Sequence, residues 1–249
     1  MAIYCAGSTK ACQYAAKFLQ GSGHRIVDAP CEEVTHLLLD VPSFGAKGLL
    51  RSGEAVDGIL SSLPETVTVW GGNLHHALLE GYRKMDLLQD AIYLAENAYI
   101  TAECALDVAL PYLDITIRNC PVLIIGWGRI GKCLGRLLKN MGAEVTISAR
   151  KETDRAMIQA LGYTAMDTGS IKALDTFRLI FNTVPETVLT REQMALCNDK
   201  CVKIDLASKS GMEDEDAVVA RGLPGIHFPE SSGKLIAATI LRLCGEEMT

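Results

Sequence analysis

Three glycines in one short segment have the spacing of a phosphate-binding turn. They form the pattern G-x-G-x-x-G, which follows the apolar run PVLII, opens a helical pattern and leads to a second apolar run, EVTISA. In this setting the first glycine permits a tight turn, the second lets the backbone approach a pyrophosphate, and the third allows close helix packing. The N-terminus of the helix attracts the negative charge. The alternative is a strand-turn-helix that binds no ligand. We predict a dinucleotide-binding turn made of Gly126, Trp127, Gly128, Arg129, Ile130 and Gly131.

The residues after the second strand indicate which dinucleotide is bound. A site that prefers NAD usually has an Asp or Glu there, which accepts hydrogen bonds from the ribose hydroxyls. This chain has Ser148, Arg150 and Lys151 instead. A guanidinium suits the 2′-phosphate of NADP because its donors are paired in one plane. We therefore expect NADP rather than NAD; the alternative is that the two cations are only solvated surface charges.

Two further strands are predicted to end at the same crevice, because ligands of parallel sheets bind beyond the carboxyl ends of the strands. The first is followed by amide and hydroxyl groups that suit a ribose or a nicotinamide amide, and the second leads into a small polar loop. We expect Lys209 in that loop to hold a substrate carboxylate; the alternative is a solvated lysine. The cofactor contacts predicted at these strand ends are Asn182, Thr183, Val184, Ala207 and Ser208.

Thr101 and Glu103 are candidates for the chemical step. They lie two residues apart in a helical pattern before the glycine turn, so they diverge by about 200° and cannot both point squarely into one cleft. We expect Glu103 to transfer a proton or to orient the substrate, and Thr101 to lie near the nicotinamide. The alternative is a helix-capping Thr and a surface Glu. His227 is a weaker candidate, since a lone histidine is commonly packed or solvated.

The composition of the chain excludes several classes of protein. A net charge of -6 without a basic stripe argues against a nucleic-acid-binding protein. No apolar run reaches the roughly 18 residues of a membrane span, and the N-terminal segment lacks the pattern of a secretion signal. Many of the nine cysteines lie in apolar segments, which fits reduced thiols and a cytoplasmic location.

No metal site is predicted from the histidines and cysteines. His75 and His76 are adjacent, so on a helix they would point about 100° apart and would rarely hold one ion together. Cys197 and Cys201 have a suggestive spacing, but no second pair completes a zinc site.

Short strands alternate with helices in both halves of the chain. This predicts the α/β class, with two Rossmann-like, doubly wound parallel-sheet domains joined by long interdomain helices. The substrate-side domain spans residues 1–90 and is completed by a C-terminal helix at about 232–247. A helical pattern over residues 74–117 leads through the interdomain segment, residues 91–118, and residues 119–225 form the NAD(P)-binding domain. The turn at residues 7–9 is expected to contact substrate carboxylates through its backbone amides.

These features resemble the architecture of the D-2-hydroxyacid dehydrogenases and, more closely, the family formed by the A subunit of dipicolinate synthase. The segment NAYITAECAL, residues 97–106, is similar to the family's N-x-x-x-T-A-E-G-A. The segment GLPGIHFPESSGKLI, residues 222–236, is similar to its G-L-P-G-x-x-x-P-x-[ST]-[AS]-G stretch, and DITIRNCPVLIIGWGRIG, FNTVP and IDLASKSG complete the likeness. The resemblance implies oxidation of a dihydro- or hydroxytetrahydrodipicolinate, a small anionic dicarboxylate, to the dipicolinate of bacterial spores. It also implies that the protein works with a partner, a flavoprotein B subunit.

The residues by themselves support a coarser prediction, an NADP-linked dehydrogenase that acts on a small anionic substrate. Cys104 stands where the family usually has Gly, and the first domain is expected to be shorter than the family's, at about 80 residues. The alternatives are a paralogue that acts on another small carboxylate and a non-catalytic NADP sensor. The histidine and arginine motifs of the hydroxyacid dehydrogenases are absent, so an ordinary 2-hydroxyacid is not the expected substrate. Because this fold commonly pairs through its interdomain helices, we expect a homodimer.

Overall fold

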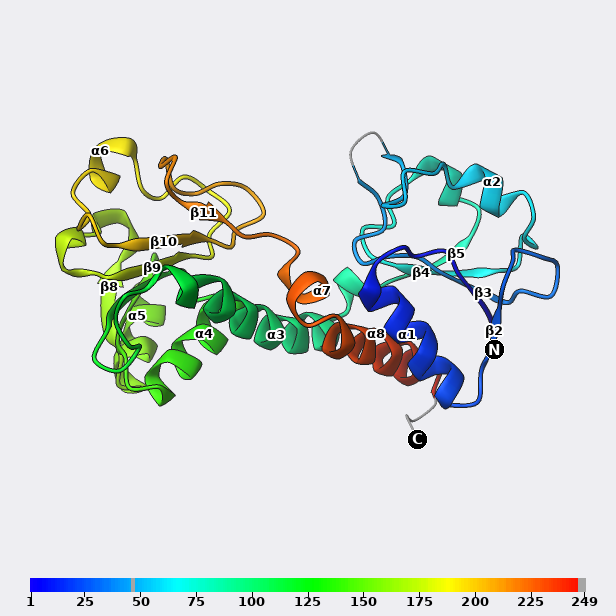
Figure 1. Ribbon diagram of the computed structural model, residues 1–249, viewed down its shortest axis with the longest axis horizontal. Coiled ribbons are helices and arrows are strands. Elements are labelled where there is room, and N and C mark those ends of the chain that lie inside the picture. The colour runs from blue at the N-terminus through cyan, green and yellow to red at the C-terminus, as the bar shows by residue number, and fades with distance from the viewer. Residues whose placement is uncertain (46–47, 246–249) are drawn as a thin grey trace. The chain divides into compact units, whose positions relative to one another are not determined.

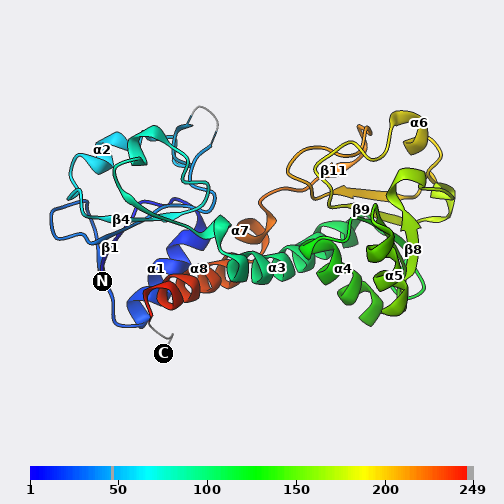
Figure 2. The same cartoon turned by 180° about the vertical axis from the view of Figure 1, so that it is seen from behind.

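The chain divides into two compact units, shown in Figures 1 and 2. The computed structural model describes residues 1–45 and 48–245. Unit 1 comprises Met1–Ile100 and Pro224–Thr249, and unit 2 comprises Thr101–Leu223. Each unit contains a sheet of parallel strands with helices packed on it, so the predicted α/β fold class is confirmed. In the described part of the chain, no helix combines the length and the apolar character that crossing a membrane requires.

Unit 1 is built on a five-stranded sheet in the order β2-β1-β3-β4-β5. The strand order reverses between β1 and β3, and in open α/β sheets such a switch point is where ligands bind, beyond the carboxyl ends of the strands. The strands are β1 (Ala2–Cys5), β2 (Arg25–Val27), β3 (His36–Leu38), β4 (Thr68–Gly71) and β5 (Arg83–Asp86).

Helices α1 (Lys10–Gly21) and α8 (Pro229–Cys244) lie side by side on one face of this sheet, and α2 (Asp57–Leu60) lies on the other (Figures 1 and 2). The two long helices approach closely because Gly233 of α8 has no side chain. A Cβ at that position would overlap Tyr14 Cβ and would lie 2.6 Å from the carbonyl oxygen of Ala11. The first and last helices of the chain therefore share one core, which includes Ile3, Leu19, Leu235 and Ile240.

The helical pattern predicted over residues 74–117 is wrong in its first part. Residues 74–90 contain the 3-10 helices η2 (Ala77–Leu79) and η3 (Leu87–Gln89) with β5 between them, and α3 (Ala91–Ala109) begins only afterwards. The Asp86 carboxylate accepts hydrogen bonds from the amides of Asn73, Leu74 and Leu88, so it stabilises a turn where a helix was expected. Of the C-terminal helix predicted at 232–247, residues 246–247 lie outside the described residues.

Unit 2 is built on a six-stranded sheet in the order β11-β10-β9-β6-β7-β8. Counted from β6, this is the strand order of dinucleotide-binding sheets, with the switch point between β6 and β9. Strands β8 and β11 were not predicted from the sequence. The strands are β6 (Pro121–Ile125), β7 (Glu144–Ala149), β8 (Thr164–Asp167), β9 (Leu179–Asn182), β10 (Val202–Asp205) and β11 (Val218–Val219).

Helices cover the sheet of unit 2 and turn their apolar sides towards it. On α4, the buried positions Gly131, Leu134, Gly135 and Leu138 recur at helical spacing. A Cβ at position 135 would lie 3.0 Å from Ile147 of β7, so this helix also packs closely. The helices are α4 (Arg129–Asn140), α5 (Glu152–Ala160) and α6 (Arg191–Met194), with the 3-10 turns η4 (Leu110–Tyr112), η5 (Thr168–Ser170) and η6 (Leu174–Thr176). From Pro224 onward, α7 (Leu223–His227) belongs to unit 1.

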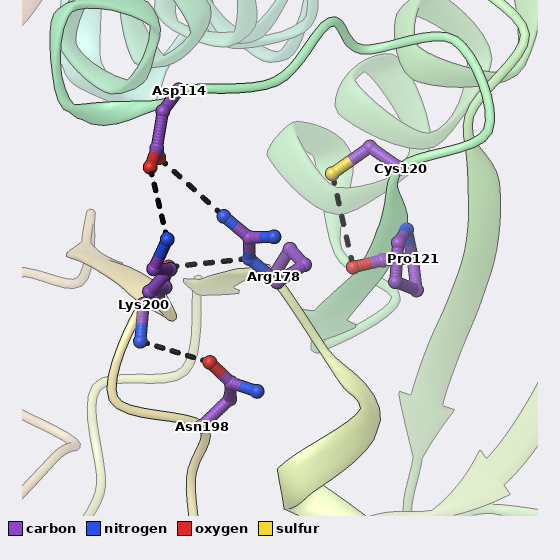
Figure 3. A network of polar contacts seen from close by, with 6 residues as sticks. All are labelled: Asp114, Cys120, Pro121, Arg178, Asn198 and Lys200. Carbon is purple, nitrogen blue, oxygen red and sulfur yellow. Dashed lines mark hydrogen bonds and ion pairs between the residues drawn. The ribbon is translucent and has the colours of Figure 1, made fainter.

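A network of charges ties the segment after α3 to the amino ends of β9 and β10 (Figure 3). The Asp114 carboxylate lies 3.5 Å from Arg178 Nη2 and 3.6 Å from Lys200 Nζ. Arg178 Nε also donates to the Lys200 carbonyl oxygen at 3.4 Å. Because this network lies at the amino edge of the sheet, opposite the strand ends where ligands bind, we assign it a structural role.

Candidate functional site

The glycine turn lies at the switch point of the unit 2 sheet. Gly126 has a φ of 107°, which favours glycine, and its amide donates to the Ser148 carbonyl oxygen at 3.0 Å. A Cβ at this position would overlap Thr183 Oγ1 and would lie 2.9 Å from Val184 Cγ2. The turn after β6 is thus packed directly against the loop after β9.

The N-terminus of α4 is suited to an anion. The amides of the first turn of a helix have no intrahelical acceptor. Gly128 is the N-cap residue of α4 and no side chain caps the helix, so these amides have no side-chain cap either. A Cβ at position 128 would meet open space, whereas one at Gly131 would overlap the Gly126 carbonyl oxygen. An exposed helix N-terminus with a bare backbone fits a pyrophosphate. Gly128 and Arg129 are exposed, and Trp127 and Ile130 are half-buried.

The loop after β9 is fixed to the strand that precedes the glycine turn. The amide and the hydroxyl of Thr183 both donate to the Ile125 carbonyl oxygen at 2.9 Å. Thr183 and Val184 are half-buried beside the turn. The structure therefore brings these two predicted cofactor contacts together with the glycines.

Of the residues predicted to contact the cofactor at the carboxyl end of β7, only some are exposed. Ser148 is fully buried, and its hydroxyl accepts a hydrogen bond from Thr168 Oγ1 at 3.1 Å. Arg150 and Lys151 are exposed, and Arg150 Nη1 forms an ion pair with Glu186 Oε2 at 3.0 Å. The cations are thus accessible at this strand end, while the serine hydroxyl belongs to the interior.

Arg155, which was not among the predicted site residues, organises the same strand end. Its Nη1 donates to the carbonyl oxygens of Ala149 at 2.9 Å and Arg150 at 2.7 Å, and lies 3.4 Å from the Asp167 carboxylate. Its position in the first turn of α5, four residues after Lys151, is the signal that it faces back towards β7. Arg155 adds a third cation next to Arg150 and Lys151.

Asn182 forms a buried pair with Asp205 on the neighbouring strand. Both residues are fully buried, and Asn182 Nδ2 donates to Asp205 Oδ1 at 2.9 Å. Asn182 also exchanges hydrogen bonds with the backbone of Val184, at 3.0 Å each. The Asn182 side chain is thus used within the protein, where it positions the loop after β9.

Asp205 orders the loop that contains the predicted residues Ala207, Ser208 and Lys209. Its carboxylate accepts from the amides of Ala207 at 3.1 Å and Gly211 at 2.8 Å. Ser208 and Lys209 are exposed at the tip of the loop. A cation that was not predicted, Arg221, donates from Nε to the Ala207 carbonyl oxygen at 3.0 Å, so two cations flank this strand end.

Thr101 and Glu103 both lie on α3, and their exposure reflects their divergence. Thr101 is half-buried and Glu103 is exposed. Between and beside them the helix is buried, and Cys104 is fully enclosed. Burial, with the nearby Asp107 and Glu103 carboxylates, raises the pKa of the Cys104 thiol to about 12, so this thiol stays protonated and packs as a small apolar group.

The turn at residues 7–9 of unit 1 already holds a carboxylate from the chain itself. Asp40 is buried, and its oxygens accept from the amides of Ser8 at 2.9 Å and Thr9 at 3.0 Å, as well as from both hydroxyls. The prediction that these amides contact a substrate carboxylate is therefore wrong. They were read as open donors because Asp40 is far away in sequence and is brought to the turn only by the pairing of β1 with β3.

Comparison with known proteins identifies the nucleotide-binding half. Residues 90–221, more than half of the chain, match the family model of the D-isomer specific 2-hydroxyacid dehydrogenase, NAD binding domain. The chain belongs to this family. As a member of the D-isomer specific 2-hydroxyacid dehydrogenases, it is an NAD(P)-dependent oxidoreductase, and its cofactor is a nicotinamide dinucleotide.

Within this dehydrogenase family, the chain is similar to the A subunit of dipicolinate synthase, as the sequence motifs predicted. It is 27% identical over 245 residues to that protein of Bacillus subtilis (strain 168), an alignment that covers 89% of this chain and 81% of the relative. The crystal structure of the Bacillus subtilis protein matches with a TM-score of 0.82 at 21% identity, over 98% of this chain and 96% of that one. The structure from Bacillus halodurans matches equally, with a TM-score of 0.82 at 22% identity over 98% of both chains.

Proposed function

We propose that this dehydrogenase uses NADP to oxidise a dihydro- or hydroxytetrahydrodipicolinate to dipicolinate. The observation that carries the proposal is the uncapped α4 N-terminus at the switch point, with Arg150 and Lys151 exposed at the end of β7 where an NAD site has a carboxylate. The similarity to the A subunit of dipicolinate synthase supports the choice of substrate.

Different residues around the switch point bind different parts of the cofactor. The turn at residues 126–131 holds the pyrophosphate through backbone amides, and Arg150 with Lys151 holds the 2′-phosphate. Both members of the ion pair between Arg150 and Glu186 are exposed, at 71% and 63%, and such a pair stabilises by only about 0–1 kcal/mol. Arg150 therefore exchanges Glu186 for a phosphate at little cost.

The substrate side is assigned to the exposed residues that flank the same strand ends. A dicarboxylate needs cations, which Lys209 supplies from the loop after β10. When bound, NADP accepts the hydride that leaves the substrate. Glu103 takes up or orients the accompanying proton, and Thr101 is assigned to the nicotinamide end of the site.

Partners and setting follow from the same resemblance. We assign two protein partners, which are a second copy of this chain and a flavoprotein B subunit. The nine cysteines are all free thiols, which supports a reducing, cytoplasmic setting.

The test is an assay of the purified chain, alone and with a flavoprotein B subunit, on freshly generated hydroxytetrahydrodipicolinate. Dipicolinate absorbance is followed with NADP and then with NAD. We expect product with NADP that disappears in Gly128→Asp and persists in the neutral, equally sized Gly128→Asn. Absence of product while calorimetry still detects NADP binding would contradict the substrate, and would favour another small carboxylate or an NADP sensor.

A further inference from the structure

The switch point of unit 1 contains two thiols that face each other. Cys5 is the last residue of β1 and Cys12 lies in the first turn of α1. Their Sγ atoms are 3.4 Å apart, whereas a disulfide bond measures about 2.05 Å. Closing this gap needs an approach of roughly 1.3 Å, which is within the range of small side-chain rotations.

The backbone around the pair is built to accommodate the sulfur atoms. A Cβ at Gly7 would overlap Cys12 Sγ, so the turn between the two cysteines leaves room for sulfur and for nothing larger at residue 7. Cys12 Sγ also lies 3.6 Å from the Leu39 carbonyl oxygen, and Cys5 Sγ lies 3.8 Å from the Cys12 carbonyl oxygen. The Asp40 carboxylate holds the rest of the turn through Ser8 and Thr9. The thiols are therefore kept in register by their surroundings.

The two thiols differ in access. Cys12 is 1% exposed, so a reagent in solution does not reach it, and Cys5 is only half-buried. The hydrogen bond from Cys12 lowers the pKa of the Cys5 thiol against the opposing effect of burial, while the bond to Cys5 and burial raise the pKa of Cys12. One thiol is thus suited to attack and the other to resolve.

We propose that Cys5 and Cys12 form a redox-active dithiol that a small-molecule disulfide, such as glutathione disulfide, oxidises to an intramolecular disulfide. The Cys5 thiolate attacks one sulfur of the small disulfide, whose S–S bond breaks and releases a thiolate. Cys12 then loses its proton and attacks Cys5 Sγ in the mixed disulfide, and the second small thiol leaves. The protein loses two electrons and two protons in total, and the small disulfide is reduced to two thiols.

The position of the pair gives the modification a consequence for unit 1. The disulfide joins the carboxyl end of β1 to the first turn of α1, at the strand order reversal where open α/β sheets bind ligands. Its formation also removes the Cys12 thiol proton, so Cys12 Sγ can no longer donate to either of its neighbours, Cys5 Sγ and the Leu39 carbonyl oxygen. Oxidation therefore acts at the carboxyl edge of the sheet, at the strand order reversal, and not on a remote surface.

The sequence provides a direct readout, because Lys10 lies between the two cysteines and Lys17 follows them. The full chain is equilibrated without oxygen in mixtures of reduced and oxidised glutathione, quenched with acid, alkylated and digested with trypsin. We expect the peptide that ends at Lys10 to become linked to residues 11–17 as the share of oxidised glutathione rises, and dithiothreitol to reverse the link. Absence of this link at every ratio would overturn the proposal, and the result needs no variant.

Two variants test the division of roles. Cys12→Ser is expected to accumulate glutathione on Cys5 at least tenfold above the level on Cys120, a buried thiol within the same chain. Cys5→Ser is expected to leave Cys12 unmodified at the same glutathione ratio. Equal modification of Cys12 in Cys5→Ser and of Cys5 in Cys12→Ser would contradict the assignment of Cys5 as the attacking thiol.

Discussion

At the scale of single residues, substitutions of Gly128 allow the stability of the fold and the binding of NADP to be tested separately. It is the N-cap of α4, where Asp and Asn are both favoured, and a Cβ there meets open space. Gly128→Asp and Gly128→Asn are therefore expected to keep the free energy of unfolding within about 1 kcal/mol of the natural chain. The added carboxylate repels the pyrophosphate, so we expect Gly128→Asp to weaken NADP binding at least tenfold more than Gly128→Asn.

Urea unfolding and titration calorimetry measure these two effects separately. Gly131→Ala serves as the contrasting variant, because its Cβ overlaps the Gly126 carbonyl oxygen and is expected to destabilise the chain by about 1–3 kcal/mol. Equal NADP affinity in the Asp and Asn variants at position 128 would show that the pyrophosphate does not lie at this helix end.

Arg150 and Glu186 make the choice between NADP and NAD testable. Arg150→Ala removes a charge-assisted contact, so we expect about tenfold weaker binding of NADP and unchanged binding of NAD. Glu186→Gln removes the carboxylate that pairs with Arg150 at 3.0 Å, so we expect tighter binding of NADP alone. Calorimetric Kd values for both dinucleotides decide the matter. Equal weakening of both by Arg150→Ala would mean that this residue does not contact the 2′-phosphate.

The sequence predicted the roles of residues that act through the local backbone. It did not predict the roles of residues whose contacts depend on strand pairing. The three glycines were found because a turn and a helix start are local features. Asn182 was expected to face a ligand, but its amide bonds to Asp205, which lies 23 residues away and is brought next to it by the pairing of β9 with β10. Arg221 was missed because its partner is a backbone carbonyl, which carries no sequence signal. Arg155 has a local signal in its place on α5, but its partner Asp167 is brought close only by the pairing of β7 with β8.

At the scale of elements, one nearly buried ion pair fastens β10 to the segment before β11. Lys203 Nζ lies 2.6 Å from Asp214 Oδ2, with side-chain exposures of 14% and 12%. Burial, the largest single influence, raises the pKa of Asp214, but the hydrogen bonds from Lys203 and the Asp216 amide, together with the charges of Lys203 and Arg191, outweigh it, so the pKa of this carboxyl is lowered in the folded chain. Its contribution to stability is therefore complete above the unfolded-state pKa of about 3.9 and is lost as the pH falls through the folded-state pKa.

Replacing Asp214 is expected to show directly how stability depends on pH through its ion pair with Lys203. Asp214→Asn leaves the nearly buried Lys203 ammonium without the opposite charge of its partner, and breaking such a pair typically costs about 3–5 kcal/mol of unfolding free energy. Glu215→Gln is the matched control, since its ion pair with Arg191 is exposed, at 88% on the Glu side, and exposed pairs contribute about 0–1 kcal/mol. Urea unfolding at pH 7 and at about pH 3, below the unfolded-state pKa of Asp214, measures both. Equal losses in the two variants would contradict the role of burial.

The strands that the sequence did not reveal share a place in their sheets. β5, β8 and β11 are all edge strands, so each pairs with one neighbour only. An edge strand is partly solvated and lacks the continuous apolar run of a central strand. β5 reads RKMD, with charges that suit a helix surface equally well, and so it was absorbed into a helical pattern. The central strands PVLII and LIFN were predicted correctly because both of their faces are covered.

At the scale of the whole molecule, α8 completes the core of a unit that the chain begins to build at its other end. Gly233→Val is expected to force α1 and α8 apart, because no Cβ fits there, and to destabilise unit 1 by at least about 1–3 kcal/mol. Amide hydrogen exchange is expected to accelerate in α1 and to stay unchanged in β6 of unit 2. Acceleration of both elements to the same extent would contradict a local effect on unit 1.

The split of unit 1 between the two ends of the chain orders events during synthesis. A ribosome releases the whole of Thr101–Leu223 before any residue of α8 appears, so the dinucleotide half of the dehydrogenase can fold while its neighbour is still incomplete. Until α8 is synthesised, the apolar side of α1 and the strand face beneath it lack the cover that α8 provides. The nascent polypeptide thus carries an exposed hydrophobic surface from its first helix to its last, which is the kind of surface that molecular chaperones bind.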